Sequence, residues 1–241
     1  MRFPTPLVPA RLIRRYKRFL ADMVLADGTE VTAHCPNSGS MMGLSEPGAS
    51  CWLEPVAGPG RKLPYAWRLV VLEGGHMAGI DATLPNRLVA EALRQGRIPA
   101  LAGYPEVRAE QRYGTRSRVD FLLQGPQGRA FVEVKNVHLR RSGDWAEFPD
   151  CVTARGAKHL DELSAVAAAG DRAVLLDVVQ RTDCARFRLA GDLDPGYARA
   201  AARARAAGVE FLAHGTRITA ADTGASVEIG GEMPLEPGLP G

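Results

Sequence analysis

The fold of the second half of the chain is decided by two neighbouring stretches, Arg118-Val119-Asp120-Phe121-Leu122-Leu123 and Ala130-Phe131-Val132-Glu133-Val134-Lys135-Asn136-Val137. Both are rich in Val, Phe and Leu, and the turn signal Gly125-Pro126-Gln127-Gly128 lies between them. The pattern predicts a β-hairpin with an acid on each strand.

Side chains alternate between the two faces of a strand, so Glu133 and Lys135 share one face while Val132 and Val134 point to the other. Two carboxylates held close together repel each other, and a bound divalent cation allows both to stay ionised. Asp120, Glu133 and Lys135 are therefore a candidate cation site. The pattern is loose, however, and Glu-x-Lys is also typical of the solvated face of an antiparallel strand.

The composition is that of a globular protein, because 241 residues with 46% hydrophobic content suffice for one large domain or two small ones. The net charge is only +3, but its distribution is uneven. Six basic residues precede the first acid, Asp22: Arg2, Arg11, Arg14, Arg15, Lys17 and Arg18. This local excess points more strongly to a polyanionic partner than the total charge does.

The four cysteines, Cys35, Cys51, Cys151 and Cys184, show no spacing typical of a zinc site. We expect reduced thiols in a cytoplasmic protein. No segment approaches the eighteen or so apolar residues that a membrane span requires, so no membrane contact is expected.

Two domains and a tail are predicted along the chain. Residues 1–83 look all-β, with strand candidates at 10–25, 30–34, 51–56, 67–72 and 78–83, a pattern that favours a small barrel. Residues 84–230 mix both element types and predict a mixed sheet flanked by helices, an α/β nuclease-like arrangement. Helices are expected at 86–95, 154–169 and 195–207, and strands at 107–113, 118–123, 130–137, 173–179 and 209–213. Residues 231–241, rich in Pro and Gly, are expected to form a flexible tail.

Several blocks of this chain resemble the sugar fermentation stimulation protein family, SfsA. They occur in the family's order and are Leu12-Ile13-Arg14-Arg15-Tyr16-Lys17-Arg18-Phe19-Leu20-Ala21-Asp22, His34-Cys35-Pro36-Asn37-Ser38-Gly39-Ser40-Met41, the Asp120/Glu133/Lys135 strands, and Phe148-Pro149-Asp150-Cys151-Val152-Thr153-Ala154-Arg155-Gly156-Ala157-Lys158-His159-Leu160. The resemblance implies an N-terminal barrel of the oligonucleotide/oligosaccharide-binding (OB) type and a C-terminal domain similar to PD-(D/E)xK nucleases. It also implies DNA binding and a link to sugar utilisation genes. Asn136, after the Lys, departs from the expected Ser-like residue.

By the same resemblance, Asp120 and Glu133 would hold Mg²⁺, or Mn²⁺, with the main-chain carbonyl of Val134. Hard oxygen ligands with retained waters suit Mg²⁺ better than zinc. Lys135 would position the attacking water and stabilise charge on the phosphate. Glu110 and His159 are further catalytic candidates, although Glu110 is equally well explained as a solvated edge-strand charge and His159 as a satisfied helix histidine.

The candidate DNA-binding residues mix cations with an aromatic ring, as barrels that track single strands do. They are Arg14, Arg15, Tyr16, Lys17 and Arg18 on the first domain, and Arg155 and Lys158 on the 154–169 helix. The alternative is that Tyr16 and Phe19 face the barrel core and the basic residues are merely solvated. The turn at Asn37-Ser38-Gly39 either presents N–H groups to a phosphate or is simply a tight turn. Asp150 and Thr153 are expected to cap the helix that follows them.

Three functions compete. The first is a Mg²⁺-dependent deoxyribonuclease acting on single- or double-stranded DNA. The second is a non-catalytic DNA-binding regulator of sugar (maltose) metabolism genes that uses a nuclease-like scaffold. The third, a sugar-binding barrel, lacks the aromatic cluster that it would need. The oligomeric state stays open, with a homodimer as one option.

Overall fold

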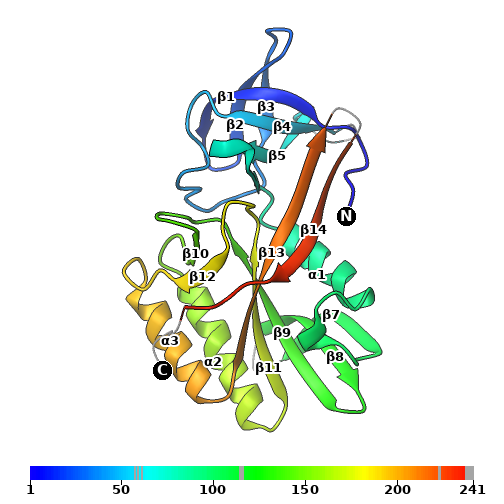
Figure 1. Cartoon of the computed structure of the whole chain (residues 1–241), viewed down its shortest axis with the longest axis vertical. Coiled ribbons are helices and arrows are strands. Elements are labelled where there is room, and N and C mark those ends of the chain that lie inside the picture. Colours follow the sequence, from blue (N-terminus) through cyan, green and yellow to red (C-terminus); the bar gives the residue numbers. More distant parts are fainter. Residues whose placement is uncertain (57, 59, 61, 114–116, 222–223, 237–241) are drawn as a thin grey trace.

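The computed structural model describes residues 1–236 except 57, 59, 61, 114–116 and 222–223. Figure 1 shows two parts, a small barrel at the top and a helix-flanked sheet below it. The chain passes from the first to the second just before helix α1.

The barrel contains β1 (Val8–Tyr16), β2 (Leu20–Leu25), β3 (Glu30–His34), β4 (Ser50–Pro55), β5 (Tyr65–Val71) and β6 (Met77–Gly79). The strand order is β3-β2-β1-β4-β5-β6, and an additional parallel pairing between β3 and β5 closes it. Its core is apolar and includes Leu12, Met23, Leu53 and Trp67, all fully buried. The expected small barrel is confirmed.

One strand expectation in the barrel is wrong. The predicted strand over residues 10–25 is two strands, β1 and β2, joined by a tight turn at Lys17 and Arg18. Both turn residues have positive φ, 47° and 62°, a conformation that the strand pattern of the surrounding residues does not reveal. The basic cluster therefore lies on and beside a hairpin turn.

The second part is a six-stranded mixed sheet of described residues in the order β14-β13-β11-β9-β8-β7. Its strands are β7 (Glu106–Tyr113), β8 (Ser117–Gly125), β9 (Gly128–Val137), β11 (Arg172–Val179), β13 (Glu210–Ala221) and β14 (Gly224–Glu232). Strands β9, β11 and β13 run parallel in the centre, while β7, β8 and β14 pair antiparallel. Two further short strands, β10 (Trp145–Phe148) and β12 (Arg186–Leu189), pair in parallel.

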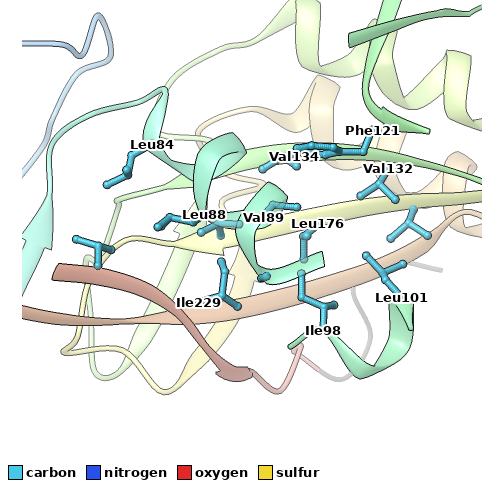
Figure 2. Close-up of a cluster of buried hydrophobic side chains, with 14 of the residues drawn as sticks. Leu84, Leu88, Val89, Ile98, Leu101, Phe121, Val132, Val134, Leu176 and Ile229 are labelled. Atoms are coloured by element: carbon cyan, nitrogen blue, oxygen red, sulfur yellow. The ribbon is translucent and has the colours of Figure 1, made fainter. Parts of the chain in front are cut away.

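Helices cover both faces of this sheet. Helix α1 (Leu84–Arg94) packs Leu88 and Val89 on one face against Val132, Val134 and Leu176 (Figure 2). Helices α2 (Ala154–Ala168) and α3 (Pro195–Ala206) lie side by side on the other face (Figure 1) and bury Phe131 and Leu175. Two short 3₁₀ turns, η1 (Glu73–Gly75) and η2 (Pro99–Leu101), complete the elements within the described residues.

The prediction of a flexible tail is wrong for those of its residues that the structure describes. Residues 231 and 232 belong to β14, Met233 is buried, and Leu235 pairs with Phe187. Their backbone groups bond to Ala213 and Phe187. Apolar residues between the prolines allow this segment to pack along β12. The remaining residues of that prediction, 237–241, lie outside the described part of the chain.

Polar contacts join the two parts. The Gly79 N–H donates to the carbonyl of Gln180, and the Gln180 side chain donates to the carbonyl of Asp81 at 2.9 Å. The buried Asn37 side chain contacts His138 Nδ1 at 3.3 Å, and burial lowers the pKa of His138 to about 4. Along the edge strand β14, Met1 and Phe3 bond to Val227 and Ala225.

Candidate functional site

The candidate site forms where β8 parts from β9. Phe121 pairs with Val132, and beyond that pair the Asp120 carboxylate accepts a hydrogen bond from the Val134 N–H at 2.7 Å. Val119 packs beneath α2 and α3 whereas Phe121 packs beneath α1, so the regular alternation of β8 breaks at Asp120. The side chain of Asn86, in the first turn of α1, donates to the other Asp120 oxygen at 2.7 Å.

Glu133 projects from β9 toward the α2 side of the sheet, on the same face as Phe131 and Lys135. The predicted alternation is therefore confirmed. Only 3% of Glu133 is exposed, and its Oε1 accepts a hydrogen bond from the Lys135 ammonium at 2.8 Å. The same oxygen contacts Nδ1 of His159. Three predicted catalytic candidates thus meet around one carboxylate oxygen.

Helix α2 positions His159. The helix begins after Thr153, whose hydroxyl accepts a hydrogen bond from the Gly156 N–H at 3.1 Å. Arg155, one turn before His159, donates from Nε to His159 Nε2 at 3.3 Å. Because Nε2 then acts as an acceptor, Nδ1 carries the proton that faces Glu133. His159 therefore orients Glu133.

The electrostatics of the two acids differ. Burial, together with the charge of Glu133, raises the pKa of Asp120 against the opposing hydrogen bonds from Val134 and Asn86. Burial acts in the same direction on Glu133, but the hydrogen bond from His159 and the ammonium of Lys135 outweigh it and lower the pKa of Glu133. The pair thus repels across β8 and β9, and a cation between them would relieve that repulsion.

The residues present fit a hard divalent cation. Glu133 Oε2 is buried and has no hydrogen-bond partner among the described residues, so this oxygen is available as a ligand. In the described part of the chain, no three or more His, Cys, Asp or Glu side chains are arranged so that together they could hold a metal ion. Two carboxylates without further side-chain ligands suit Mg²⁺, which usually keeps several waters. The structure places the Val134 N–H on Asp120, and a role for the Val134 carbonyl stays a prediction.

Glu110 is not part of this cluster. It is exposed, and no hydrogen bond or ion pair joins it to Asp120 or Glu133 in the described residues. Its φ of 54° marks an irregularity in β7 between the Ala109–Phe121 and Gln111–Val119 pairs, directly across from Asp120. A catalytic role for Glu110 stays a prediction without a contact to support it.

The cations predicted to bind DNA on the barrel divide into two groups. Arg14 pairs with Asp22 at 2.9 Å and lies over the Tyr16 ring, and Arg15 donates to backbone carbonyls of the Asn37–Ser40 segment. Those two side chains already have partners. Lys17 and Arg18, at the turn, are exposed and form no ion pair within the described residues. On α2, Lys158 lies 3.6 Å from Glu162, and Arg155 contacts His159.

The alternative that Tyr16 and Phe19 face the barrel core is wrong. Neither belongs to the buried cluster of the barrel; Tyr16 is half-buried and Phe19 is 48% exposed. The hydroxyl of Tyr16 donates to Asp22.

The Asn37-Ser38-Gly39 turn uses its N–H groups within the protein. The Gly39 N–H donates to the Asn37 side chain at 2.8 Å, and the Ser40 N–H donates to Asp150 at 3.1 Å. These contacts support the tight-turn interpretation. The expectation that Asp150 caps α2 is wrong. Its carboxylate accepts a hydrogen bond from Ser40 of the barrel, and the cap of α2 is Thr153.

Sequence reasoning missed Asn86 and Asp177. Asn86 carries no signal, because a polar residue on an amphipathic helix is usually solvated. Asp177 does carry one, since it interrupts an otherwise apolar buried strand. It pairs in register with Lys135, is fully buried, and has no partner for either carboxylate oxygen among the described residues. Burial raises the pKa of Asp177 to about 8.

A groove elsewhere on the molecule does not share this chemistry. It occupies about 940 Å³ between the N-terminal segment, β4, β5 and the start of α1. Its acids, Glu54 and Asp81, are both paired with Arg68, at 2.6 and 2.7 Å. Because Arg68 already pairs with both acids, the groove offers no acid pair to a cation.

Among the described residues, no helix has the length and apolar content needed to cross a membrane.

Comparison with known proteins agrees with this architecture. Residues 13–80 match the family model described as SfsA N-terminal OB domain, and residues 83–222 match the sugar fermentation stimulation protein RE domain. The chain is 65% identical to a sugar fermentation stimulation protein homolog of Jannaschia sp. over 240 residues, which cover 98% of each chain. It is 61% identical to the homolog of Dinoroseobacter shibae, covering 98% of this chain and 96% of that one.

A solved structure provides the same match in three dimensions. It is described as Pyrococcus furiosus SfsA in complex with Ca²⁺, and it aligns with a TM-score of 0.86 at 29% identity over 98% of each chain. Both halves and their order are therefore shared with that protein. The chain belongs to the sugar fermentation stimulation protein family.

Proposed function

We propose that this protein is a divalent-metal-dependent nuclease that binds DNA and hydrolyses its phosphodiester bonds, with Mg²⁺ as the preferred ion. The observation that carries the proposal is the pair of acids on two separating strands, one of which has a buried oxygen without a partner, beside a lysine. The Ca²⁺ complex of the Pyrococcus furiosus relative supports a site for a hard divalent cation in this family.

Asp120 and Glu133 would hold the cation. When bound, Mg²⁺ would polarise the phosphate and lower the pKa of a coordinated water. The protein supplies the rest. Asn86 and the Val134 N–H fix the Asp120 carboxylate, and His159 fixes that of Glu133. Lys135 carries its ammonium next to Glu133, where it stabilises the negative charge that develops on the phosphate as the water oxygen bonds to phosphorus and the bond from phosphorus to the leaving oxygen breaks. The attacking water releases its proton to solvent, and solvent protonates the leaving oxygen.

A second function has one observation in its favour. Lys135 and His159 both contact Glu133 Oε1, so the acid is already balanced by protein groups. An internally balanced cluster is what a non-catalytic DNA-binding scaffold would retain. Under this second proposal, the protein binds DNA as a regulator and cuts nothing.

One incubation separates the two. The purified protein is mixed with end-labelled single- and double-stranded DNA in Mg²⁺, Mn²⁺ or chelator, beside Asp120→Asn, Glu133→Gln and the matched control Glu106→Gln, an exposed acid of β7. We expect metal-dependent shortening by wild type and by the control, and a loss of about a hundredfold or more in both site variants. If wild type binds DNA yet yields no shorter product with either metal, the nuclease proposal fails and the regulator remains.

A further inference from the structure

Most of the exposed large apolar side chains lie close in sequence to residues that join the barrel to α2. Among the described residues, the exposed large hydrophobic side chains are Ile13, Phe19, Met42 and Val152, at 36, 48, 46 and 74%. Single exposed apolar residues are normal on a protein surface. Three of these four, however, lie within two residues of a chain of contacts that links the barrel to α2, and this grouping requires an explanation.

The contacts run through Arg15 and Ser40. The Arg15 guanidinium donates to the carbonyl of Arg18, which precedes Phe19, and to the carbonyl of Ser40, which lies two residues before Met42. The Ser40 hydroxyl donates to Asp150 at 2.9 Å, and Val152 follows two residues later. Helix α2 then begins, with Arg155 and His159 leading to Glu133. A chain of contacts thus runs from the β1–β2 turn to the candidate catalytic acid, and three of the exposed apolar residues lie near it in the sequence.

At the start of this chain of contacts lies an exposed pair of stacked aromatic rings. The rings of Phe19 and His34 are nearly parallel, with an interplanar angle of 20° and centroids 6.5 Å apart. Both residues are exposed. The backbone fixes them, because Leu20 pairs with His34 and the Cys35 N–H donates to the Phe19 carbonyl at 2.8 Å. The stacked pair is therefore held in place before any ligand arrives.

The charge around this pair of rings suits a polyanion. Lys17 and Arg18 precede Phe19 directly, are exposed, and form no ion pair in the described part of the chain. The nearby acid Asp22 is already bonded to Arg14, Tyr16 and Thr32. We name the set Lys17, Arg18, Phe19 and His34 the hairpin platform.

We propose that the hairpin platform binds the unpaired bases of a single-stranded polynucleotide and directs the strand along the Arg15, Ser40 and Asp150 contacts toward Glu133. In a duplex the faces of the bases are covered by their neighbours, so an exposed ring has nothing to stack on. In a single strand every base offers a flat face, while Lys17 and Arg18 meet the phosphates. This inference rests on the proposed DNA binding and specifies the strandedness of the substrate.

Fluorescence anisotropy in the presence of a chelator tests the platform without cleavage. The probes are a labelled oligothymidylate, an abasic strand of the same length, and a duplex. We expect wild type to bind oligothymidylate more tightly than either of the other two. Phe19→Ala should weaken oligothymidylate binding about five- to a hundredfold and leave abasic binding unchanged, because only the stacking is removed. Phe19→Trp should retain affinity, and Ile13→Ala serves as the exposed apolar control.

Equal affinity for the abasic strand and oligothymidylate, or a Phe19→Ala variant that binds like wild type, would overturn the platform. The second result would also be expected if the patch served a protein partner instead. Failure here is distinguishable from failure of the nuclease proposal. Mg²⁺-dependent cleavage of single-stranded DNA that is unaffected by Phe19→Ala preserves the nuclease and removes the platform, whereas stacking-dependent binding without cleavage preserves the platform and removes the nuclease.

Discussion

Asp177 shows what a single buried carboxylate does to this molecule. It lies beside Lys135 in the register of β9 and β11, and its pKa is raised to about 8 by burial. An unfolded Asp titrates near pH 3.9. Between these two values the unfolded state binds fewer protons than the folded state, so the free energy of unfolding falls as the pH rises from about 4 to about 8.

We therefore expect Asp177→Asn to be more stable than wild type at pH 8, by on the order of a few kcal/mol, with the difference vanishing near pH 4. Urea denaturation at several pH values measures it. The control is Asp161→Asn, an exposed acid paired with Arg203. An Asp177→Asn protein with the same pH slope as wild type would contradict the assignment.

Arg15 tests whether a cation of the barrel binds DNA or holds a loop. Its guanidinium reaches the carbonyls of Asn37 and Gly39, both at 2.9 Å, a fork that a lysine cannot reproduce. We expect Arg15→Lys to lose about 1–3 kcal/mol of stability, measured by urea denaturation. The change keeps the positive charge, so DNA affinity should hold at temperatures where the variant is folded. A stable variant with weakened DNA binding would instead assign Arg15 to the ligand.

Among the helices and strands, those with a long and periodic pattern were predicted most accurately from the sequence. The hairpin of β8 and β9, helices α1, α2 and α3, and the buried strand β11 were all expected close to their observed bounds. Strands β10 and β12 were missed because four residues carry too little pattern, and β14 because Gly224, Gly230 and Gly231 weaken its strand signal. The split between β1 and β2 depends on positive φ angles at Lys17 and Arg18, and neither residue type indicates such a conformation in a sequence.

The candidate site divides in the same way. Asp120, Glu133 and Lys135 were predicted from local alternation and from the family resemblance. The contact of His159 with Glu133 depends on how α2 packs on the sheet, and the bond from Asn86 to Asp120 depends on how α1 packs. The two contacts join residues that lie 26 and 34 positions apart in the sequence, and the periodicity of a single element cannot predict contacts between elements.

The cap of α2 offers a prediction for an element. Thr153 accepts from the Gly156 N–H, and this bond fixes the helix turn that carries Arg155 and leads to His159. We expect Thr153→Ala to lose about 1 kcal/mol of stability, while Thr153→Ser keeps most of it. Thermal denaturation of both variants measures the difference. If the two variants unfold at the same temperature, the hydroxyl is not a cap.

The whole molecule depends on close contact between the barrel and the sheet. A Cβ added at Gly79 would lie 2.6 Å from Gln180 Oε1, too close for the two to coexist. The Gln180 side chain also bonds to Asn136 at 2.6 Å and to the Asp81 carbonyl. Displacing it would disturb contacts from both parts at once.

We expect Gly79→Ala to destabilise the protein by about 1–3 kcal/mol. Gly231→Ala is the matched control, because its added Cβ meets nothing within 4 Å. Calorimetric unfolding measures both variants. A Gly79→Ala protein as stable as the control would show that the junction is looser than these contacts imply.

The central claim is that Asp120 and Glu133 together hold a divalent cation, and titration calorimetry with Mn²⁺ in the absence of nucleic acid tests it most directly. We predict that wild type and the exposed-acid control Asp161→Asn bind a single Mn²⁺, and that Asp120→Asn and Glu133→Gln each bind it about tenfold or more weakly. Binding by either site variant with wild-type affinity, or no binding by wild type, would contradict the claim.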